Sequence, residues 1–154
     1  ELYRKAMQRA EQQGFHSADR FRLIRGGTYE LLHRATAALV TSGTPTLEPA
    51  LFGVPQIVCY YIPRGPVIRL ARRLFLKVPY ISLVNLVCGR EVVPELVASD
   101  MNAARLTPAL RSILPGGEAR DAQLKGYAEM RRLLGAPGAP QHAAREMVEI
   151  LHRK

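Results

Sequence analysis

The sequence predicts an α/β fold, a Rossmann-like parallel sheet with helices on both faces followed by C-terminal helices. Short apolar runs at Ala38–Val40 and Ile57–Ile62 flank one helical segment, which favours two parallel strands joined by a helix. Glycine turns precede two predicted helices, at Gly26–Gly27 and at Gly43. The last third of the chain has helical periodicity. We therefore expect a Rossmann-like domain over residues 1–100 and C-terminal helices over residues 101–154 that pack on it.

Length and charge set the first bounds on function. The 154 residues are enough for one domain with a buried core. Lys and Arg outnumber Asp and Glu by 22 to 13, so a net charge of +9 favours an anionic partner, whether nucleic acid, anionic lipid or a phosphorylated substrate. Cys59 and Cys88 have no paired or metal-ligand spacing, which predicts a reduced cytosolic compartment and no metal site. Because the sequence starts at Glu1 within a helical pattern, we expect a segment of a longer protein.

The N-terminal elements come first along the chain. A charged helix is predicted over Glu1–Gln13, and Gly14 ends it. The apolar residues of Phe21–Arg25 predict a short strand, and a helix is predicted over Tyr29–Ala35. Between them Gly27 has two interpretations, a close backbone approach to a ligand or a plain tight turn.

The next stretch is the centre of the predicted fold. Ala38–Val40 is apolar enough for a strand buried on both faces. Thr44 is placed to cap a helix, and Pro45 at the first helical position lacks an amide hydrogen that would be unpaired there anyway. Gly53 ends that helix and Pro55 prevents its continuation before the next strand. The order is strand, glycine turn, helix, strand.

This order predicts an anion site at the start of the helix. Unpaired amide hydrogens near Ser42, Gly43 and Thr44, with the positive end of the helix dipole, suit a phosphate. Glu48 shares a helix face with Thr44, and its carboxylate could accept hydrogen bonds from ribose hydroxyls, which favours a nucleotide. The alternative is an ordinary capped helix that carries one exposed glutamate.

A basic amphipathic helix is predicted over Val67–Lys77. Arg69, Arg72 and Arg73 crowd the face opposite its apolar side. Such a helix can dock on an anionic membrane surface, or it can cover the sheet with its basic face in solvent.

A second polar cluster follows a predicted strand at Tyr80–Leu83. Asn85, Arg90 and Glu91 lie among apolar residues after this strand, where open α/β sheets place their ligands. Arg90 suits a phosphate and Asn85 a sugar or an amide. The alternative for Arg90 is a buried salt bridge that holds the loop.

The sequence of the last third of the chain predicts three helices. The first begins at Asp100 or Asn102 and runs to Leu114, the second covers Ala119–Leu134, and the third covers His142–Arg153 after a linker at Gly135–Pro140. No histidine, cysteine or serine has the neighbours that nucleophilic or metal catalysis requires, so we expect neither a catalytic residue nor a cofactor in this chain.

Two motifs together resemble a known family. They are Ser42-Gly43-Thr44-Pro45-Thr46-Leu47-Glu48 and the stretch Lys77–Leu96, which contains Val78-Pro79-Tyr80-Ile81-Ser82-Leu83 and Gly89-Arg90-Glu91-Val92-Val93-Pro94-Glu95-Leu96. The chain from Ala38 to its end is similar to lipid-A-disaccharide synthase. The resemblance implies a two-domain GT-B glycosyltransferase, of which this chain is the C-terminal, nucleotide-sugar-binding half. The helices over residues 101–154 would then also pack toward the N-terminal half.

The resemblance also implies a reaction. Enzymes of this family join UDP-2,3-diacylglucosamine to 2,3-diacylglucosamine 1-phosphate with inversion, and they release UDP and the lipid A disaccharide 1-phosphate. They work without a metal, as peripheral proteins on the cytoplasmic face of the inner membrane of Gram-negative bacteria. The general base and much of the acceptor site would belong to the N-terminal half, so this segment alone should be inactive.

By the same resemblance, Ser42, Gly43 and Thr44 would hold the diphosphate and Glu48 the ribose. Asn85, Arg90 and Glu91 would line the cleft, and Arg69, Arg72 and Arg73 would contact anionic lipid. Half of such an enzyme would expose the cleft face that the other half covers, so self-association as a homodimer or exchange of C-terminal helices is a further expectation. The alternatives are another UDP-sugar enzyme of GT-B fold, such as an N-acetylglucosaminyltransferase or an epimerase, and a basic nucleic-acid-binding domain. The second lacks aromatic platforms and a recognition-helix pattern, so we expect no nucleic acid partner.

Overall fold

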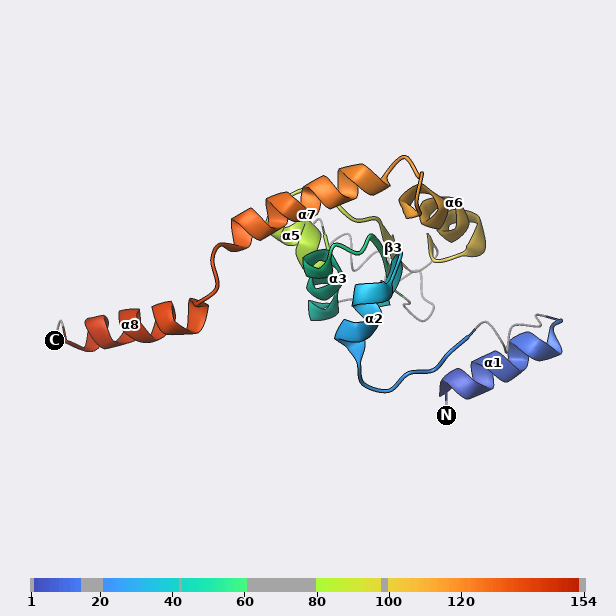
Figure 1. Ribbon diagram of the computed structural model, residues 1–154, viewed down its shortest axis with the longest axis horizontal. Coiled ribbons are helices and arrows are strands. Elements are labelled where there is room, and N and C mark those ends of the chain that lie inside the picture. The colour runs from blue at the N-terminus through green and yellow to red at the C-terminus, as the bar shows by residue number, and fades with distance from the viewer. Residues whose placement is uncertain (1, 15–20, 42, 61–79, 98–99, 153–154) are drawn as a thin grey trace, which may run out of the picture. The chain divides into compact units, whose positions relative to one another are not determined.

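The computed structural model describes residues 2–14, 21–41, 43–60, 80–97 and 100–152 (Figure 1). The chain divides into two compact units, Glu1–Leu31 and Leu32–Lys154. In the first unit, α1 (Leu2–Gln12) is followed by a turn in which Gly14 has a φ of 85°. The helix predicted there and its glycine stop are confirmed. Helix α2 (Thr28–Arg34) begins in this unit and confirms the helix predicted over Tyr29–Ala35.

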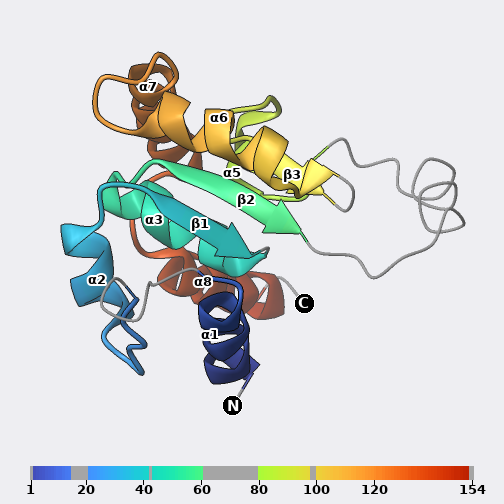
Figure 2. The ribbon, with the colours of Figure 1, turned by 90° about the vertical axis from the view of Figure 1, so that its right-hand side faces the viewer.

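The second unit contains a parallel sheet. Its strands are β1 (Ala38–Thr41), β2 (Gln56–Tyr60) and β3 (Glu95–Val97), in the order β1-β2-β3. Both pairings are parallel, and the register aligns Val40 with Val58 and Val58 with Glu95. Figure 2 shows the three strands side by side and running in one direction. The predicted α/β class and the parallel pair joined through one helix are confirmed.

Alternate residues of β2 face two separate apolar clusters. Val58 packs with the first, which is formed by α3 (Leu47–Phe52), α5 (Leu83–Cys88) and α7 (Arg120–Leu134). Ile57 and Cys59 face the second, to which α6 (Ala103–Ile113) contributes. Figure 2 shows α6 along one face of the sheet and α3 along the other. The buried members of the two clusters are Ala50, Val58, Val84, Val93, Tyr127 and Met130, and Ile57, Cys59, Leu96 and Ile113.

The first strand is more exposed than its apolar sequence predicts. The side chains of β1 alternate between half-buried and exposed, and Leu39 keeps 50% of its surface accessible. Among the described strands β1 pairs with β2 alone, so one of its edges is open. The strand that is buried is instead β2, which has a neighbouring strand on each side and of which only Tyr60 is half-buried. The prediction that Ala38–Val40 is buried on both faces is wrong.

Two predicted strands are absent from the described residues. Phe21–Arg25 is extended and exposed, without strand pairing, because a strand requires backbone partners that local sequence does not supply. Tyr80–Leu83 is also not a strand. Ser82 caps α5 by accepting a hydrogen bond from the Asn85 amide at 3.3 Å, so its preference for helix starts prevails over the apolar run.

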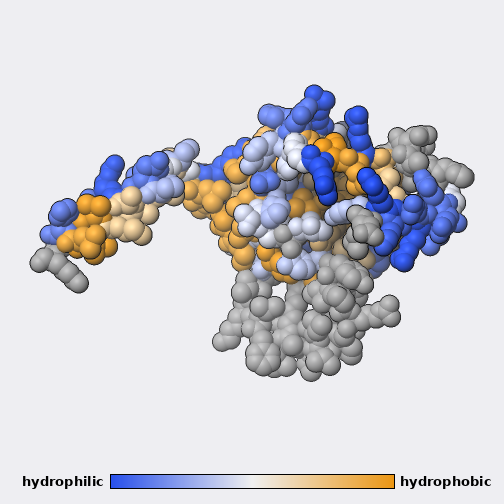
Figure 3. Space-filling view, turned by 90° about the horizontal axis from the view of Figure 1, so that it is seen from below, coloured by the Kyte–Doolittle hydropathy of each residue, from blue (hydrophilic) through white to orange (hydrophobic). Residues whose placement is uncertain are grey.

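The C-terminal helices follow the prediction closely. Asn102 caps α6, and Gly135 follows α7. Helix α8 (Ala139–His152) begins three residues before His142, because proline is tolerated in a first helical turn and Pro140 therefore does not extend the linker. Helix α8 buries none of its residues, and Figure 3 shows the apolar surface along it. Its large exposed apolar side chains are Met147, Val148, Ile150 and Leu151.

Across the part of the chain that the structure describes, no helix is both long and apolar enough to span a lipid bilayer. The amphipathic helix predicted over Val67–Lys77 lies outside the described residues, as does the end of the strand predicted over Ile57–Ile62.

Candidate functional site

The glycine turn after β1 starts the candidate site. Gly43 has φ 90° and ψ −152°, a conformation that favours glycine because a Cβ would strain it. A short 3₁₀ helix, η1 (Thr44–Thr46), follows and leads directly into α3. The Thr46 amide donates to the Gly43 carbonyl at 3.0 Å, which closes the turn. The turn therefore lies at the carboxyl end of β1, where open parallel sheets bind their ligands.

Thr44 does not cap a helix through its side chain, contrary to the prediction. Gly43 occupies the cap position of η1, and Thr46 occupies that of α3, both without a side-chain cap bond. Thr44 is exposed and Gly43 is half-buried. The 3₁₀ turn moves the start of the α-helix by three residues, which explains why a prediction based on one continuous helix misplaced the cap.

Thr46 is the residue behind this turn, and the sequence analysis gave it no role. Its side chain is fully buried. Its Oγ1 donates to the Gly43 carbonyl at 2.7 Å and accepts from the Leu83 amide at 3.2 Å. Its own carbonyl accepts from Gln56 Nε2 at 2.8 Å. Thr46 therefore connects the turn both to the first turn of α5 and to the first residue of β2.

The hydrogen bonds continue from Thr46 to α7. The Gln56 amide donates to Gln123 Oε1 at 2.6 Å, and Gln123 Nε2 donates to the Gln56 carbonyl at 3.1 Å. Tyr127 Oη lies 2.8 Å from Gln123 Oε1 and 3.2 Å from the Val54 carbonyl oxygen. Burial raises the pKa of the Tyr127 phenol above its usual range, so the hydroxyl remains a donor at neutral pH. We call Thr46, Gln56, Gln123 and Tyr127 the buried polar chain.

Glu48 lies in the first turn of α3, close in sequence to the Gly43 turn. Its side chain is half-buried, and among the described residues its carboxylate has no hydrogen-bond or ion-pair partner. A carboxylate in this state can accept two hydrogen bonds from a ligand without first breaking an internal contact. Whether it binds ribose stays a prediction.

Asn85 is fully buried in α5, and both ends of its carboxamide are bonded within the chain. Its Oδ1 accepts from the amides of Val92 at 2.7 Å and Val93 at 2.9 Å. Its Nδ2 donates to the Val93 carbonyl at 2.8 Å and to Glu95 Oε1 at 2.9 Å. Glu95 also accepts from the amides of Ile81 and Ser82. Asn85 thereby fixes the loop from Gly89 to Pro94, which leads into β3.

Arg90 and Glu91 lie on that loop, and both are exposed. The expectation that they directly follow a strand is wrong, because the loop precedes β3 and follows α5. Leu83, at the start of α5, contacts Thr46, whereas Arg90 lies past the other end, roughly 9 Å further along the helix. Arg90 forms an ion pair with Glu129 of α7 at the surface, with 51% and 33% of the side chains exposed, so a buried salt bridge is also wrong.

Of the remaining predicted site residues, the structure describes one, and the other four lie outside the described ranges. Gly27 is exposed, with a φ of 67°, and its carbonyl accepts from the Leu31 amide at 3.0 Å at the start of α2. It belongs to the first unit, and its ligand contact stays a prediction. Ser42, Arg69, Arg72 and Arg73 lie outside the described residues.

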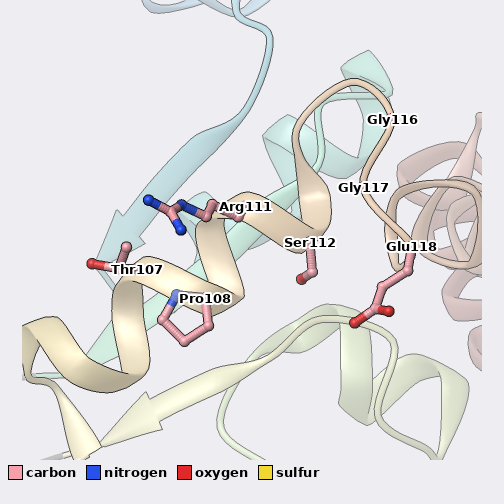
Figure 4. Close-up of a pocket in the computed structure, with 7 residues that line it drawn as sticks. All are labelled: Thr107, Pro108, Arg111, Ser112, Gly116, Gly117 and Glu118. Carbon is pink, nitrogen blue, oxygen red and sulfur yellow. The ribbon is translucent and has the colours of Figure 1, made fainter.

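A shallow depression lies on the other face of the sheet from the Gly43 turn's helix α3. Figure 4 shows its lining side chains on α6 and on the turn that follows it. None of the predicted site residues lines this depression. The residues that line it are Thr107, Pro108, Arg111, Ser112, Gly116, Gly117 and Glu118.

Metal-binding and thiol groups give no second site within the described residues. No three His, Cys, Asp or Glu side chains gather there in a way that could hold a metal ion. Burial raises the pKa of the Cys59 and Cys88 thiols, which keeps both in the unreactive protonated form at neutral pH.

Comparison with known proteins identifies the family. The family model described as lipid-A-disaccharide synthetase matches residues 3–143, which include the Gly43 turn, α5 and α7. The chain belongs to this family. The resemblance that the Ser42–Glu48 and Lys77–Leu96 motifs indicated is thereby confirmed.

Curated relatives agree with the family model. Lipid-A-disaccharide synthase of Myxococcus xanthus is 39% identical over 129 residues, 84% of this chain and 33% of that protein. The synthase of Syntrophus aciditrophicus is 42% identical over 123 residues, 80% of this chain and 32% of that protein. The synthase of an Anaeromyxobacter species is 35% identical over 136 residues, 88% and 35% of the two chains. The aligned part of this chain spans about a third of the length of these relatives.

Proposed function

We propose that this chain is the donor-nucleotide-binding part of a lipid-A-disaccharide synthase. The observation that carries the proposal is the Gly43 turn at the carboxyl end of β1 in a chain of this family. The complete protein would join UDP-2,3-diacylglucosamine to 2,3-diacylglucosamine 1-phosphate with inversion, and it would form the lipid A disaccharide 1-phosphate and UDP. The match to the family model sets aside the other UDP-sugar enzymes of GT-B fold.

The Gly43 turn would hold the donor diphosphate. Its backbone conformation favours glycine, and Thr44, the next residue, is exposed. Backbone amides in such a turn form a concave anion site without a charged side chain. Ser42 would add its hydroxyl, and the Glu48 carboxylate, which has no partner within the part of the chain that the structure describes, would accept hydrogen bonds from the two ribose hydroxyls.

In this proposal the residues of the second predicted cluster have two different roles. Arg90 and Glu91 are exposed on the loop before β3, so their side chains are available to the sugar or to the rest of the cleft. Asn85 would act on the ligand through this loop, because its carboxamide is already occupied by Val92, Val93 and Glu95. A contact of Gly27 with the donor also remains part of the proposal.

Catalysis would require the rest of the protein. The aligned part of the chain covers only about a third of the length of its relatives. We therefore expect this part to bind UDP and the donor, and the remainder to supply the general base and the acceptor site. The part alone would be inactive.

The basic segment would hold the enzyme at its substrates. With a net charge of +9, the chain is attracted to anionic lipid, and Arg69, Arg72 and Arg73 are the proposed contacts. This places the protein peripherally on the cytoplasmic face of the inner membrane of a Gram-negative bacterium. Sedimentation with phosphatidylglycerol vesicles tests the proposal. The triple change of these arginines to glutamate should abolish co-sedimentation, and unchanged binding would contradict it.

A homodimer would cover the apolar side of α8. Ile150 and Leu151 keep 64% and 73% of their surfaces exposed, which is unusual for large apolar side chains in water. We propose that α8 packs on a second copy of the chain. Light scattering should give a dimer for the natural protein and a monomer after Ile150→Glu and Leu151→Glu, whereas an unchanged mass would contradict this role.

Calorimetric titration tests nucleotide binding directly. UDP should bind the full-length protein with one site per chain, and ADP is the matched control for the base. Absence of heat with UDP, together with salt-sensitive binding to RNA, would instead favour the nucleic-acid-binding alternative.

A further inference from the structure

Thr46 fixes the orientation of one peptide group in the Gly43 turn. The Gly43 carbonyl oxygen accepts two hydrogen bonds, from the Thr46 amide at 3.0 Å and from Thr46 Oγ1 at 2.7 Å. The Gly43 carbonyl and the Thr44 amide hydrogen belong to the same planar trans peptide, so they point in opposite directions. Because Thr46, which is fully buried, holds the carbonyl, the Thr44 amide hydrogen is directed away from Thr46, and Thr44 itself is exposed.

The same hydroxyl connects the turn to α5. Thr46 Oγ1 accepts from the Leu83 amide at 3.2 Å, which is one of the first-turn amides that no carbonyl within α5 can satisfy. Ser82 Oγ satisfies the Asn85 amide in the same turn. A hydroxyl has one donor and can accept, so the Thr46 side chain uses its donor on Gly43 and an acceptor site on Leu83. Valine has the same shape and supports neither bond.

The backbone of Thr46 is held as firmly as its side chain. Its carbonyl accepts from Gln56 Nε2 at 2.8 Å, and Gln56 is bonded through its own amide and carbonyl to Gln123 of α7. All three residues are at most 2% exposed. Rotation of the Gly43–Thr44 peptide would break the Oγ1 bond to Gly43 and leave a buried hydroxyl hydrogen unpaired, which is costly.

We propose that Thr46 is a positioning residue for the donor diphosphate: its hydroxyl holds the Gly43–Thr44 peptide so that the Thr44 amide hydrogen points at the phosphate. The inference rests on the proposed function, since it requires UDP at the Gly43 turn. Thr46 itself is buried and does not touch the nucleotide.

The test compares hydroxyl-removing and hydroxyl-keeping variants by titration of the full-length protein with UDP. Thr46→Val removes both side-chain bonds and retains the shape, and Thr46→Ser retains the hydroxyl. Ser112→Ala is the matched control, because it also removes a hydroxyl bond, the 2.8 Å bond to the Ala109 carbonyl within α6. We expect Thr46→Val to weaken UDP binding about ten-fold. Thr46→Ser and Ser112→Ala should stay within about two-fold of the natural protein.

The number of sites separates positioning from a merely structural role. If Thr46→Val only unfolds part of the sample, the number of binding sites falls and the Kd of the remainder is unchanged, which would overturn the inference. A weakened Kd with one site per chain supports it. If Thr46→Val does not fold, Thr46→Cys replaces the hydroxyl by a weak donor of similar size. A Kd for Thr46→Cys equal to that for Thr46→Ser would then overturn the inference, and a weaker one supports it.

The same titration distinguishes this inference from the proposed function. Absence of UDP binding by the natural protein overturns the proposed function and the inference with it. Normal UDP binding by the natural protein and by folded Thr46→Val overturns the inference alone.

Discussion

Two glycine turns of this chain share a positive φ but differ in ψ, which is −152° at Gly43 and 12° at Gly89, and in their surroundings. Gly43 and Gly89 both have positive φ, 90° and 64°, and each adjoins a short helix. A buried polar side chain supports each one, Thr46 behind the first and Asn85 beneath the second. The first directs backbone groups outward, whereas the second carries an exposed charged side chain, Arg90, that already has a partner in Glu129.

The comparison teaches which kind of group each turn offers a ligand. At Gly43 the groups offered to a ligand are backbone amides whose direction is fixed by buried hydrogen bonds, so small changes of backbone geometry should alter ligand binding. At Gly89 the groups offered are side chains at the surface, and a change of one of them should leave the fold intact. The predictions below test this difference, from the largest expected effect to the smallest.

Asn85→Leu should be the most damaging of these changes. It removes four hydrogen bonds and leaves the buried amide and carbonyl of Val93 without partners. We expect a loss of about 3 to 5 kcal/mol in the free energy of unfolding, measured by urea denaturation. A loss below about 1 kcal/mol would mean that the loop does not depend on Asn85.

Asn85→Asp sharpens the same point through pH. The new carboxylate would face Glu95, whose Oε1 lies 2.9 Å from Asn85 Nδ2. Two adjacent carboxylates raise the pKa of one of them in the folded state. A carboxyl group whose pKa is raised in the folded state stabilises the fold at low pH, and this stabilisation is lost as the pH rises through the folded-state pKa. The deficit in the free energy of unfolding, relative to the natural protein, should therefore shrink from pH 7 toward pH 5. A deficit independent of pH would contradict this contact.

Gly43→Ala and Gly89→Ala form a matched pair. A Cβ has space at both positions, so the cost comes from the backbone conformation. Gly43→Ala should lose about 3 kcal/mol of stability, because its φ and ψ are essentially restricted to glycine, and Gly89→Ala about 1 to 2 kcal/mol, because its conformation is left-handed helical. Only Gly43→Ala should also weaken UDP binding, by about ten-fold or more, because only that turn is proposed to hold the diphosphate. Equal UDP affinity for the two variants would contradict the assignment.

Tyr127→Phe tests the far end of the buried polar chain. It removes one hydroxyl that is shared by the Gln123 side chain and the Val54 carbonyl, and it retains the ring. We expect a loss of about 1 kcal/mol in the free energy of unfolding. Thermal denaturation followed by circular dichroism measures it, and a gain in stability would show that the hydroxyl is not needed there.

Arg90→Ala should have the smallest effect on stability. Its ion pair with Glu129 is exposed, and exposed pairs contribute little to stability because water and salt screen them. A double-mutant cycle with Glu129→Ala isolates the pair. A coupling free energy as large as the loss measured for Tyr127→Phe would show that the loop depends on this contact after all.

Much of the fold could be predicted because its signals are local. The glycine at Gly53, the cap at Asn102 and the periodicity of α7 mark helix ends and faces within a few residues. The strand predicted at Phe21–Arg25 failed because strand formation depends on a distant partner. The strand predicted at Tyr80–Leu83 failed because Ser82 begins a helix there.

The candidate site was predictable in its backbone and less so in its side chains. Gly43 could be found from a glycine between a strand and a helix. Thr46 could not, because its contacts with Leu83 and Gln56 cross 37 and 10 residues of sequence. Arg90 was placed after a strand on local hydrophobicity, and only the contact of α5 with α7 directs it toward Glu129.

The sequence alone determined the α/β class, the parallel pair around one helix, the glycine turn and the family. These rest on periodicity, glycine conformation and a distinctive motif, all of which act over short stretches of chain. Tertiary structure decided which polar residues are buried and bonded, namely Thr46, Gln56, Gln123 and Asn85. The physical reason is that a buried hydrogen bond depends on which segments pack together, and among the described residues groups as far as 73 residues apart share one.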